Sequence, residues 1–191
     1  RMMHLMLSNI SIKEGILKKC DDHFDEGILP IMAVTQVAKN KVRPVIDYRD
    51  LNVSVSSHTA SADVCGSTLR KWRRLGCDLA LVDLSRAYLQ IHVSPELWKF
   101  QRVRYEGQVY YMTRLGFGLS VATKIMTCIL DYVLAQNEQV RRRTNSYIDD
   151  IMIDCSVTKV DVVIDVLNRY GLATKAPELI KKNGPMVRVL G

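Results

Sequence analysis

The chain has 191 residues, of which 48% are hydrophobic and 25% charged, with ten Gly and five Pro. This composition is that of a globular protein and excludes the disordered, collagen-like and low-complexity classes. Its 27 basic residues outnumber its 20 acidic ones and give a net charge of +7. Basic clusters at 39–49, 70–74 and 141–143 together favour a polyanionic partner, whereas each cluster alone is better explained as a solvated helix or loop face.

The residue pattern disfavours two further classes, a membrane-spanning protein and a zinc site. No apolar run approaches the ~20 residues that a membrane span needs, so no membrane partner is expected. The five cysteines are scattered without a Cys-x-x-Cys pair, which argues against a zinc site. Free thiols favour a reducing, intracellular compartment, cytoplasmic or nuclear.

Both ends, Arg1 and the strand-like run 187–191, look like cuts into a longer chain.

The first third of the chain predicts a hairpin between irregular segments. A short helical pattern and an acidic turn at 21–27 precede two predicted strands, 30–35 and 42–48, which are joined by a polar, basic tip. Residues 53–63 are rich in Ser, Thr and Ala and predict a loop. Residues 67–75 predict a short basic helix.

The middle of the chain predicts strands. Five of the six residues in 79–84 are aliphatic, which is typical of a central strand buried on both faces. Residues 89–93 alternate in polarity like a strand, and a further pair of strands is predicted at 100–105 and 109–114. Residues 116–118 (Gly-Phe-Gly) predict a turn.

The last third predicts two helices around a hairpin. Ser120 is the expected N-cap of an amphipathic helix, and a second helix over 158–170 is expected to stop at Gly171. Between them a hairpin is predicted with its tip at Asp149 and Asp150. Because strands and helices do not alternate regularly, the pattern indicates an α+β fold and not a doubly wound sheet.

Three carboxylates are the main candidates for chemistry. Asp83 ends the most apolar strand, where burying a carboxylate is costly unless a partner compensates it. Asp149 and Asp150 are adjacent acids between apolar flanks, and they repel each other unless a cation lies between them. An Arg partner for Asp83 and a simple Asx turn at 149–150 are the structural alternatives. If the three meet, they form an oxygen-rich site suited to Mg²⁺.

The chain resembles the fingers-and-palm part of a reverse transcriptase, of the gypsy-like LTR-retrotransposon or retroviral type. Four blocks occur in that family's order, and a closing run resembles the start of its primer-grip hairpin. They are Val42–Asn52, Val82–Ile91, Arg114–Leu119, Tyr147–Asp150 (the Tyr-x-Asp-Asp box) and Val189–Gly191. Four blocks in order are far more specific than any one of them.

The resemblance implies a right-hand polymerase: fingers and a palm with an antiparallel sheet backed by helices, and no thumb. It divides the chain into a lead-in (1–25), the fingers hairpin (26–56), the first part of the palm (57–90), a second part of the fingers (91–120) and the rest of the palm (121–191), truncated at the primer grip.

The resemblance also implies the roles of individual residues. Asp83, Asp149 and Asp150 match the catalytic, metal-binding acids. Arg43 matches the arginine that grips the triphosphate, and a surface ion pair with Asp50 is its structural alternative.

Further positions match the nucleotide pocket, and two of them have a structural alternative. Arg86 and Ala87 border the triphosphate, Tyr88 matches the steric gate that excludes a ribose 2′-hydroxyl, and Lys175 loosely matches the lysine that protonates pyrophosphate. Ordinary packing is the alternative for Tyr88, and an exposed position is the alternative for Lys175. The remaining nucleotide-binding candidates are Lys41, Phe117 and Gly118.

Some positions depart from the family pattern. The consecutive lysines of the fingers hairpin are Thr35 and Gln36 here, with Lys39 and Lys41 farther along the tip. Gly116 and Thr123 replace expected prolines. No thumb or ribonuclease H region lies within these residues.

The resemblance implies an RNA-directed DNA polymerase core with two Mg²⁺ ions, for which Mn²⁺ could substitute. Its partners would be an RNA or DNA template–primer, deoxynucleoside triphosphates, and the rest of a polyprotein or a larger assembly. One alternative is an inactive, polymerase-derived domain that binds RNA or serves as a structural component. Another is an RNA-dependent RNA polymerase, which Tyr88 opposes because such an enzyme must admit the 2′-hydroxyl.

Overall fold

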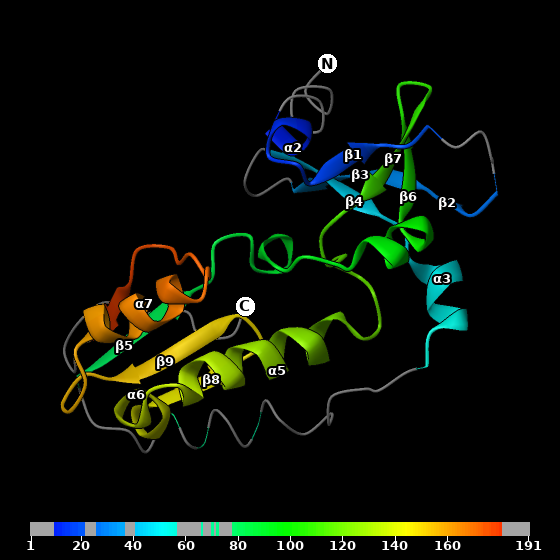
Figure 1. The fold of residues 1–191 in the computed structure, drawn as a ribbon. Helices are drawn as coiled ribbons and strands as arrows, with labels where there is room; N and C mark the ends of the chain where they lie inside the picture. Colours follow the sequence, from blue (N-terminus) through cyan, green and yellow to red (C-terminus); the bar gives the residue numbers. More distant parts are fainter. Residues whose placement is uncertain are drawn as a thin grey trace. The chain divides into compact units, whose positions relative to one another are not determined.

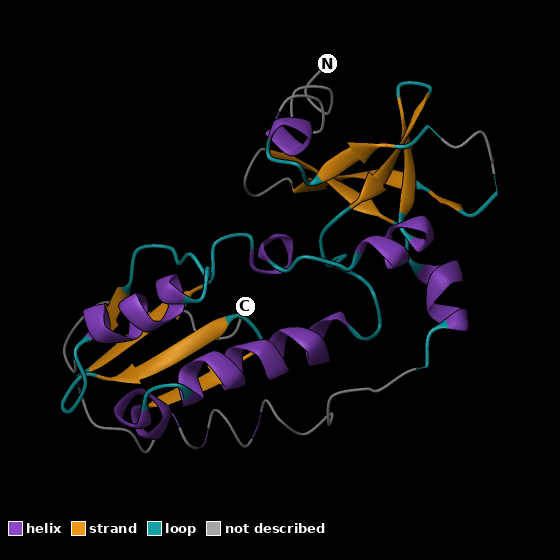
Figure 2. Ribbon diagram, viewed as in Figure 1, coloured by secondary structure: helices purple, strands orange, loops and turns teal. Residues whose placement is uncertain are grey.

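The computed structural model describes residues 10–21, 26–36, 41–56, 66, 70, 72 and 78–180. These residues form a mixed α+β fold, as the sequence predicts (Figure 2). The chain divides into two compact units: residues 1–57 with 91–122, and residues 58–90 with 123–191. Within the described ranges, no helix is long and apolar enough to cross a membrane.

The first unit contains a four-stranded sheet and a separate hairpin. The sheet has the order β1-β7-β6-β2, in which β2 runs parallel to β6 and the other pairs are antiparallel. The hairpin pairs β3 with β4 from Ile31↔Ile46 to Gln36↔Lys41. The elements are α2 (Ile10–Lys13), β1 (Leu17–Lys19), β2 (Ile28–Leu29), β3 (Ile31–Gln36), β4 (Lys41–Ile46), α3 (Arg49–Ser54), η3 (Pro95–Phe100), β6 (Arg102–Tyr105) and β7 (Gln108–Met112).

The second unit is built on an antiparallel sheet of order β10-β5-β9-β8. Helices α5 and α7 lie along one face of this sheet (Figure 1). The elements are β5 (Leu79–Asp83), η2 (Ala87–Gln90), α5 (Ala122–Ala135, which begins at the boundary with the first unit), α6 (Glu138–Arg143), β8 (Thr144–Tyr147), β9 (Asp150–Asp154), α7 (Val160–Arg169) and β10 (Glu178–Ile180).

Alternation along the two central strands gives this sheet two buried faces. One set of residues on β5 and β9 is completely buried together with the apolar sides of α5 and α7: Ala80, Val82, Ile151, Ile153, Met126, Leu130, Val163 and Leu167. On the opposite face of the sheet, Leu81 of β5 and Met152 of β9 pack with Trp72. The prediction of a central strand buried on both faces at 79–84 is therefore confirmed for its apolar residues.

Three local predictions are wrong. Residues 89–93 do not form a strand: η2 ends at Gln90, and only His92 makes an isolated bridge, to Arg114. The alternation there reflects a half-buried helical turn. Ser120 is not a helix cap, because α5 begins at Ala122 and the buried Ser120 Oγ forms no hydrogen bond with any described residue. The loop predicted from residue 53 starts later, because α3 extends to Ser54.

Other predictions fall outside the described residues. They are the hairpin tip at 37–40 with Lys39, most of the acidic turn at 21–27, most of the segment 57–75, and the closing run 189–191. The helix predicted over 158–170 is observed as α7, and Gly171 follows it with a φ of +78°. Glycine tolerates this left-handed conformation and so ends the helix.

Tyr48, from the first sequence block, packs against the turn formed by the third block. The Tyr48 hydroxyl donates to Gln101 Oε1 over 3.0 Å, and its ring is 2% exposed. A Cβ added at Gly116 would overlap this ring, and one at Gly118 would lie 3.4 Å from it. Gly116 is therefore required by close packing, and not by an unusual backbone angle.

We expect Gly116→Ala to lower the free energy of unfolding by about 3 kcal/mol, because overpacking must displace the Tyr48 ring. Gly15→Ala is the matched control: Gly15 has a φ of +68° and nothing within 4 Å of an added Cβ, so only the backbone cost of about 1 kcal/mol applies. Urea denaturation of both variants measures the difference. Equal losses would contradict the packing role of Tyr48.

Candidate functional site

The register of β5 and β9 brings two of the candidate carboxylates together. Asp83 is paired with Asp150, and two residues along the strands Leu81 is paired with Met152. Since side chains alternate between faces, Asp83 and Asp150 lie on the same face as Leu81 and Met152. Tyr147 of β8 is paired with Asp150 on its other side and packs against the cluster formed with Trp72.

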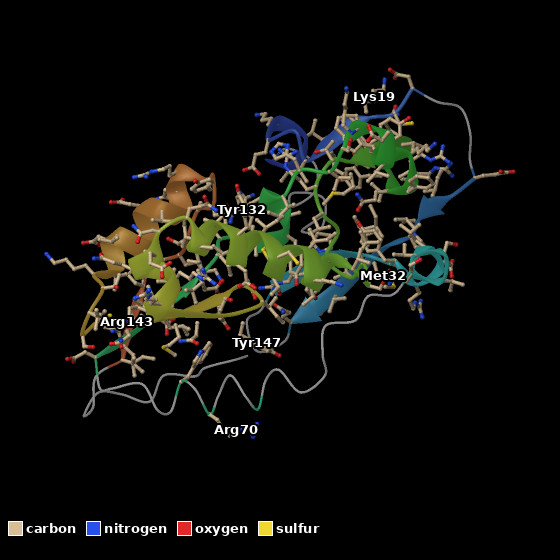
Figure 3. The ribbon with its side chains drawn as sticks, turned by 60° about the horizontal axis from the view of Figure 1, so that its bottom comes forward. Lys19, Met32, Arg70, Tyr132, Arg143 and Tyr147 are labelled. Atoms are coloured by element: carbon tan, nitrogen blue, oxygen red, sulfur yellow. The ribbon has the colours of Figure 1, made fainter. Side chains whose placement is uncertain are left out.

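Figure 3 labels Tyr147 on β8 and Tyr132 on α5. Tyr132 is 63% exposed, whereas Tyr147 is partly buried in the cluster that covers the opposite face of the sheet. The carboxylates thus share a row with a tyrosine whose ring is anchored in the core.

The third carboxylate lies in a strained turn. Ile148 and Asp149 are the two loop residues between β8 and β9, and Ile148 has a φ of +58°. A positive φ at the first loop position suits a tight hairpin but is costly for a β-branched residue. The Leu84 N–H donates to the Asp149 carbonyl over 3.2 Å, so the turn is tied to the end of β5. Asp150 is in the strand, and not at the tip that the sequence predicts.

A lysine ammonium lies at the carboxylate that ends β5. Lys175 Nζ forms an ion pair and hydrogen bond with Asp83 Oδ2. The other oxygen, Asp83 Oδ1, is a buried atom with no hydrogen-bond partner among the described residues. The Asp83 side chain is 34% exposed and that of Lys175 58%. One carboxylate oxygen is therefore neutralised, and the other is unsatisfied.

The other two acids of the site, Asp149 and Asp150, have raised pKa values. Partial burial raises the pKa of Asp149, and the neighbouring Asp83 charge adds to the effect. Burial likewise raises the pKa of Asp150 to about 6, with contributions from Asp149, Asp83 and Glu178. Lys175 lowers the pKa of both carboxyls. Acids that repel one another at one end of a sheet favour a bound cation.

The donor set suits a hard cation. Carboxylate oxygens are the ligands that Mg²⁺ prefers, and Asp83 Oδ1 lacks a partner within the described part of the chain. In the present arrangement, however, no three His, Cys, Asp or Glu side chains of the described residues are grouped closely enough to hold a metal ion. Asp83, Asp149 and Asp150 are the residues that could hold one after rearrangement of their side chains.

The residues that follow Asp83 form the start of a 3-10 helix. Arg86 is exposed and has a φ of +48°, and Ala87 is buried. Tyr88 is partly buried, with its hydroxyl 3.4 Å from Thr123 Oγ1. The sequence motif that begins with Asp83 therefore continues as a surface turn in the same unit as the carboxylates.

The other nucleotide-binding candidates belong to the first unit. Arg43 is exposed on β4 opposite Val34, whereas Lys41 is described only by its backbone. Phe117 is 67% exposed, and Gly118 has a φ of +110°.

Asn52 braces the turn that contains Phe117 and Gly118. Its side chain donates to the Gly118 carbonyl over 2.9 Å and accepts from the Ser120 N–H over 2.8 Å. The amide thus spans the turn that presents Phe117 to solvent.

Two residues of the site lie outside the set that the sequence indicates. Glu178, the first residue of β10, is paired with Leu81 and acts on Asp150 by charge. Gln90 binds the backbone beside Lys175. Gln90 lies within the second sequence block, seven residues after Asp83, which is the only signal that points to it. No sequence signal points to Glu178, because its position depends on the pairing of β10 with β5.

Comparisons with known proteins point to one fold. No family model matches the sequence, and no curated protein matches it significantly. The native protease–reverse transcriptase of prototype foamy virus is similar in structure, with a TM-score of 0.74 and 20% identity over 90% of this chain and 23% of that one. A foamy viral protease–reverse transcriptase in complex with double-stranded DNA has a TM-score of 0.70 and 21% identity over 86% of this chain and 34% of that one.

This chain therefore spans about a quarter of the length of the native foamy virus protein, whose covered share is 23%. Identities near 20% establish a likeness of fold and leave activity to the residues themselves. The described elements have the fold of part of a retroviral reverse transcriptase.

We expect the stability of the protein to fall as the pH rises through the range in which Asp150 ionises. Its folded-state pKa of about 6 lies above the ordinary 3.8, so the folded state binds the proton more tightly than the unfolded state. This contribution is full below about pH 4 and is lost as the pH rises through about 6. Asp150→Asn should therefore gain stability relative to the original protein between pH 4 and pH 7.

Urea denaturation at several pH values in this range, in the presence of a chelator, measures the gain. Asp165→Asn is the matched control, because Asp165 is exposed on α7. Its difference from the original protein should not vary in the same way. A pH-independent difference for Asp150→Asn would show that Asp150 is not destabilised by its neighbours.

Proposed function

We propose that this chain is the catalytic core of an RNA-directed DNA polymerase of the LTR-retrotransposon (gypsy-like) or retroviral type. The observation that carries the proposal is the juxtaposition of Asp83 with Asp150 across β5 and β9, next to Asp149 in the strained turn. This arrangement occurs in a fold that resembles retroviral reverse transcriptase. On this proposal, the first unit corresponds to fingers and the second to palm.

The carboxylates would hold the metal ions of nucleotidyl transfer. Two Mg²⁺ ions held there, or Mn²⁺ in their place, would supply activation of a primer 3′-hydroxyl and neutralisation of charge on the phosphates. Asp83 and Asp150 offer oxygens from facing strands, and Asp149 adds a third from the turn. Lys175 is a candidate for donating a proton to the departing pyrophosphate, since its ammonium already lies among these acids.

The remaining candidates would bind the incoming deoxynucleoside triphosphate. Arg43 suits phosphate oxygens because its guanidinium offers paired donors, and Lys41 and Arg86 would add positive charge. The Tyr88 ring would exclude a ribose 2′-hydroxyl, beside the small Ala87. Phe117 and Gly118, of the first unit, are further candidates for nucleotide binding.

The partner would be an RNA or DNA template–primer. A net charge of +7 suits a sequence-independent contact with phosphates, and two of the similar foamy viral structures are complexes with double-stranded DNA. Those proteins join a protease to the reverse transcriptase, so the remainder of a polyprotein is a candidate partner as well.

A second candidate function is a polymerase-derived domain that binds RNA without catalysis. The observation that favours it is the pairing of Lys175 with Asp83, in an arrangement where the described acids form no metal-holding group of three. The Thr35-Gln36 pair in place of the fingers lysines also favours it. On this alternative, RNA binding would be sensitive to salt and independent of divalent ions.

Primer extension on an RNA template with deoxynucleotides and Mg²⁺ or Mn²⁺ tests the proposal. We expect Asp149→Asn combined with Asp150→Asn to reduce synthesis by about a hundredfold or more, because the cations lose their charged ligands. The matched control is Asp161→Asn with Asp165→Asn, two exposed acids on α7, which should leave synthesis unchanged. RNA binding that survives the first double substitution, without any synthesis by the original protein, would favour the second candidate.

Tyr88→Val tests the proposed steric gate. Removing the ring should raise ribonucleotide incorporation relative to deoxynucleotide incorporation by about tenfold or more, because a pocket that excludes a hydroxyl by bulk loses that selectivity. Competition between the two nucleotides in single-nucleotide extension measures the ratio. Tyr132→Val removes an exposed tyrosine of α5 and should leave the ratio unchanged. An unaltered ratio in the Tyr88 variant would place this ring in the core only.

A further inference from the structure

The lysine at Asp83 is held in place by its backbone. The Lys175 N–H donates to the Asp83 carbonyl over 2.8 Å, and the Ser85 N–H donates to the Ala173 carbonyl over 2.9 Å. Between these bonds Leu84 and Thr174 form an antiparallel bridge. The segment 173–175 thus runs beside the end of β5 as a short extension of the sheet, and this register places Lys175 next to Asp83.

A glutamine side chain reinforces the same segment. Gln90 Nε2 donates to the Ala173 carbonyl over 3.0 Å and to the Ser85 carbonyl over 2.7 Å. Its Oε1 accepts from the Ala173 N–H over 2.6 Å. The Gln90 amide therefore satisfies both backbone groups of Ala173, in the manner of a neighbouring strand. Four hydrogen bonds fix the chain two residues before the lysine and at the lysine itself, and the bond to Ser85 fixes Gln90.

The Lys175 ammonium is a positive charge that acts on all three aspartates at this end of the sheet. Asp83 binds it directly, and the carboxyls of Asp149 and Asp150 both sense its charge. Glu178 adds a fourth acid that acts on Asp150. An exposed ion pair alone contributes little to stability. The backbone register places Lys175 where its ammonium reaches mutually repelling acids, a position in which a bound cation is favourable.

We propose that Lys175 is a built-in counter-ion that competes with divalent metal for Asp83. The ammonium must leave Asp83 Oδ2 before this oxygen can serve as a metal ligand, so Lys175 weakens metal binding by the protein alone while neutralising the acids in the metal-free state. This inference deepens the proposed function, because it rests on the carboxylates forming a cation site. In this role Lys175 controls whether the Asp83 carboxylate is available to bind metal. The role does not depend on any proton transfer from Lys175 to pyrophosphate.

Mn²⁺ binding without nucleotide or nucleic acid tests the proposal. Titration monitored by water-proton relaxation gives the dissociation constant for the original protein, for Lys175→Met and for the control Lys159→Met, which removes an exposed lysine at the start of α7. We expect Lys175→Met to bind Mn²⁺ about tenfold more tightly, because a positive charge in contact with a ligand opposes the ion. Lys159→Met should match the original protein.

Thermal unfolding of the same variants provides a second readout. In EDTA, Lys175→Met should melt at a lower temperature than Lys159→Met, since its acids are no longer neutralised. Mn²⁺ should raise the melting temperature of Lys175→Met by more than it raises that of Lys159→Met. Equal or weaker Mn²⁺ binding by Lys175→Met would overturn the proposal, as would the absence of Mn²⁺ binding in all three proteins. Tighter binding by the variant in a protein that synthesises no DNA would uphold the counter-ion and reject only the polymerase.

Discussion

The pairing of β5 with β9 is the constraint on which the site depends. This register sets Asp83 beside Asp150 and, on the opposite face, buries Val82 beside Ile151. A slip of one residue would turn both sets of side chains to the wrong faces. The completely buried residues beneath α5 and α7 therefore hold the carboxylates together. Packing on one face of the sheet determines the chemistry available on the other.

Bringing like charges together is unfavourable, and the fold offsets it in two ways. Partial exposure leaves Asp149 and Asp150 in contact with solvent, and the Lys175 ammonium neutralises part of the negative charge. The strained Ile148 backbone adds to the cost. A sheet selected for stability alone would carry neither the acids nor this turn, and strain and perturbed acids gathered at one place are typical of functional sites.

The first unit shows that a sequence block can have a purely structural part. Tyr48 and Asn52 come from the first block, and they pack against or bind Gly116, Gly118 and Ser120 of the third block and its flank. These two blocks form one connected piece of structure although they lie some distance apart in the chain. Part of the pattern in these two blocks therefore serves the fold, independently of any role in chemistry.

Much of the fold follows from local pattern alone. The apolar run that ends at Asp83, the hairpin before Ile151 and the amphipathic helix that ends at Gly171 were all predictable, because burial of a strand or of one helix face imposes its own period on the sequence. The segment 89–93 was not, because its alternation arises from a helical turn whose Gln90 bonds the backbone of a distant segment.

Local pattern is enough to identify the α+β class and the three acids that could act together. Tertiary contacts make Asp83 and Asp150 cross-strand neighbours, bring Glu178 to them and bind Lys175 to Asp83. All three arrangements have one cause. Strand register and the place of an edge strand such as β10 depend on contacts between residues far apart in the chain, which no local pattern encodes.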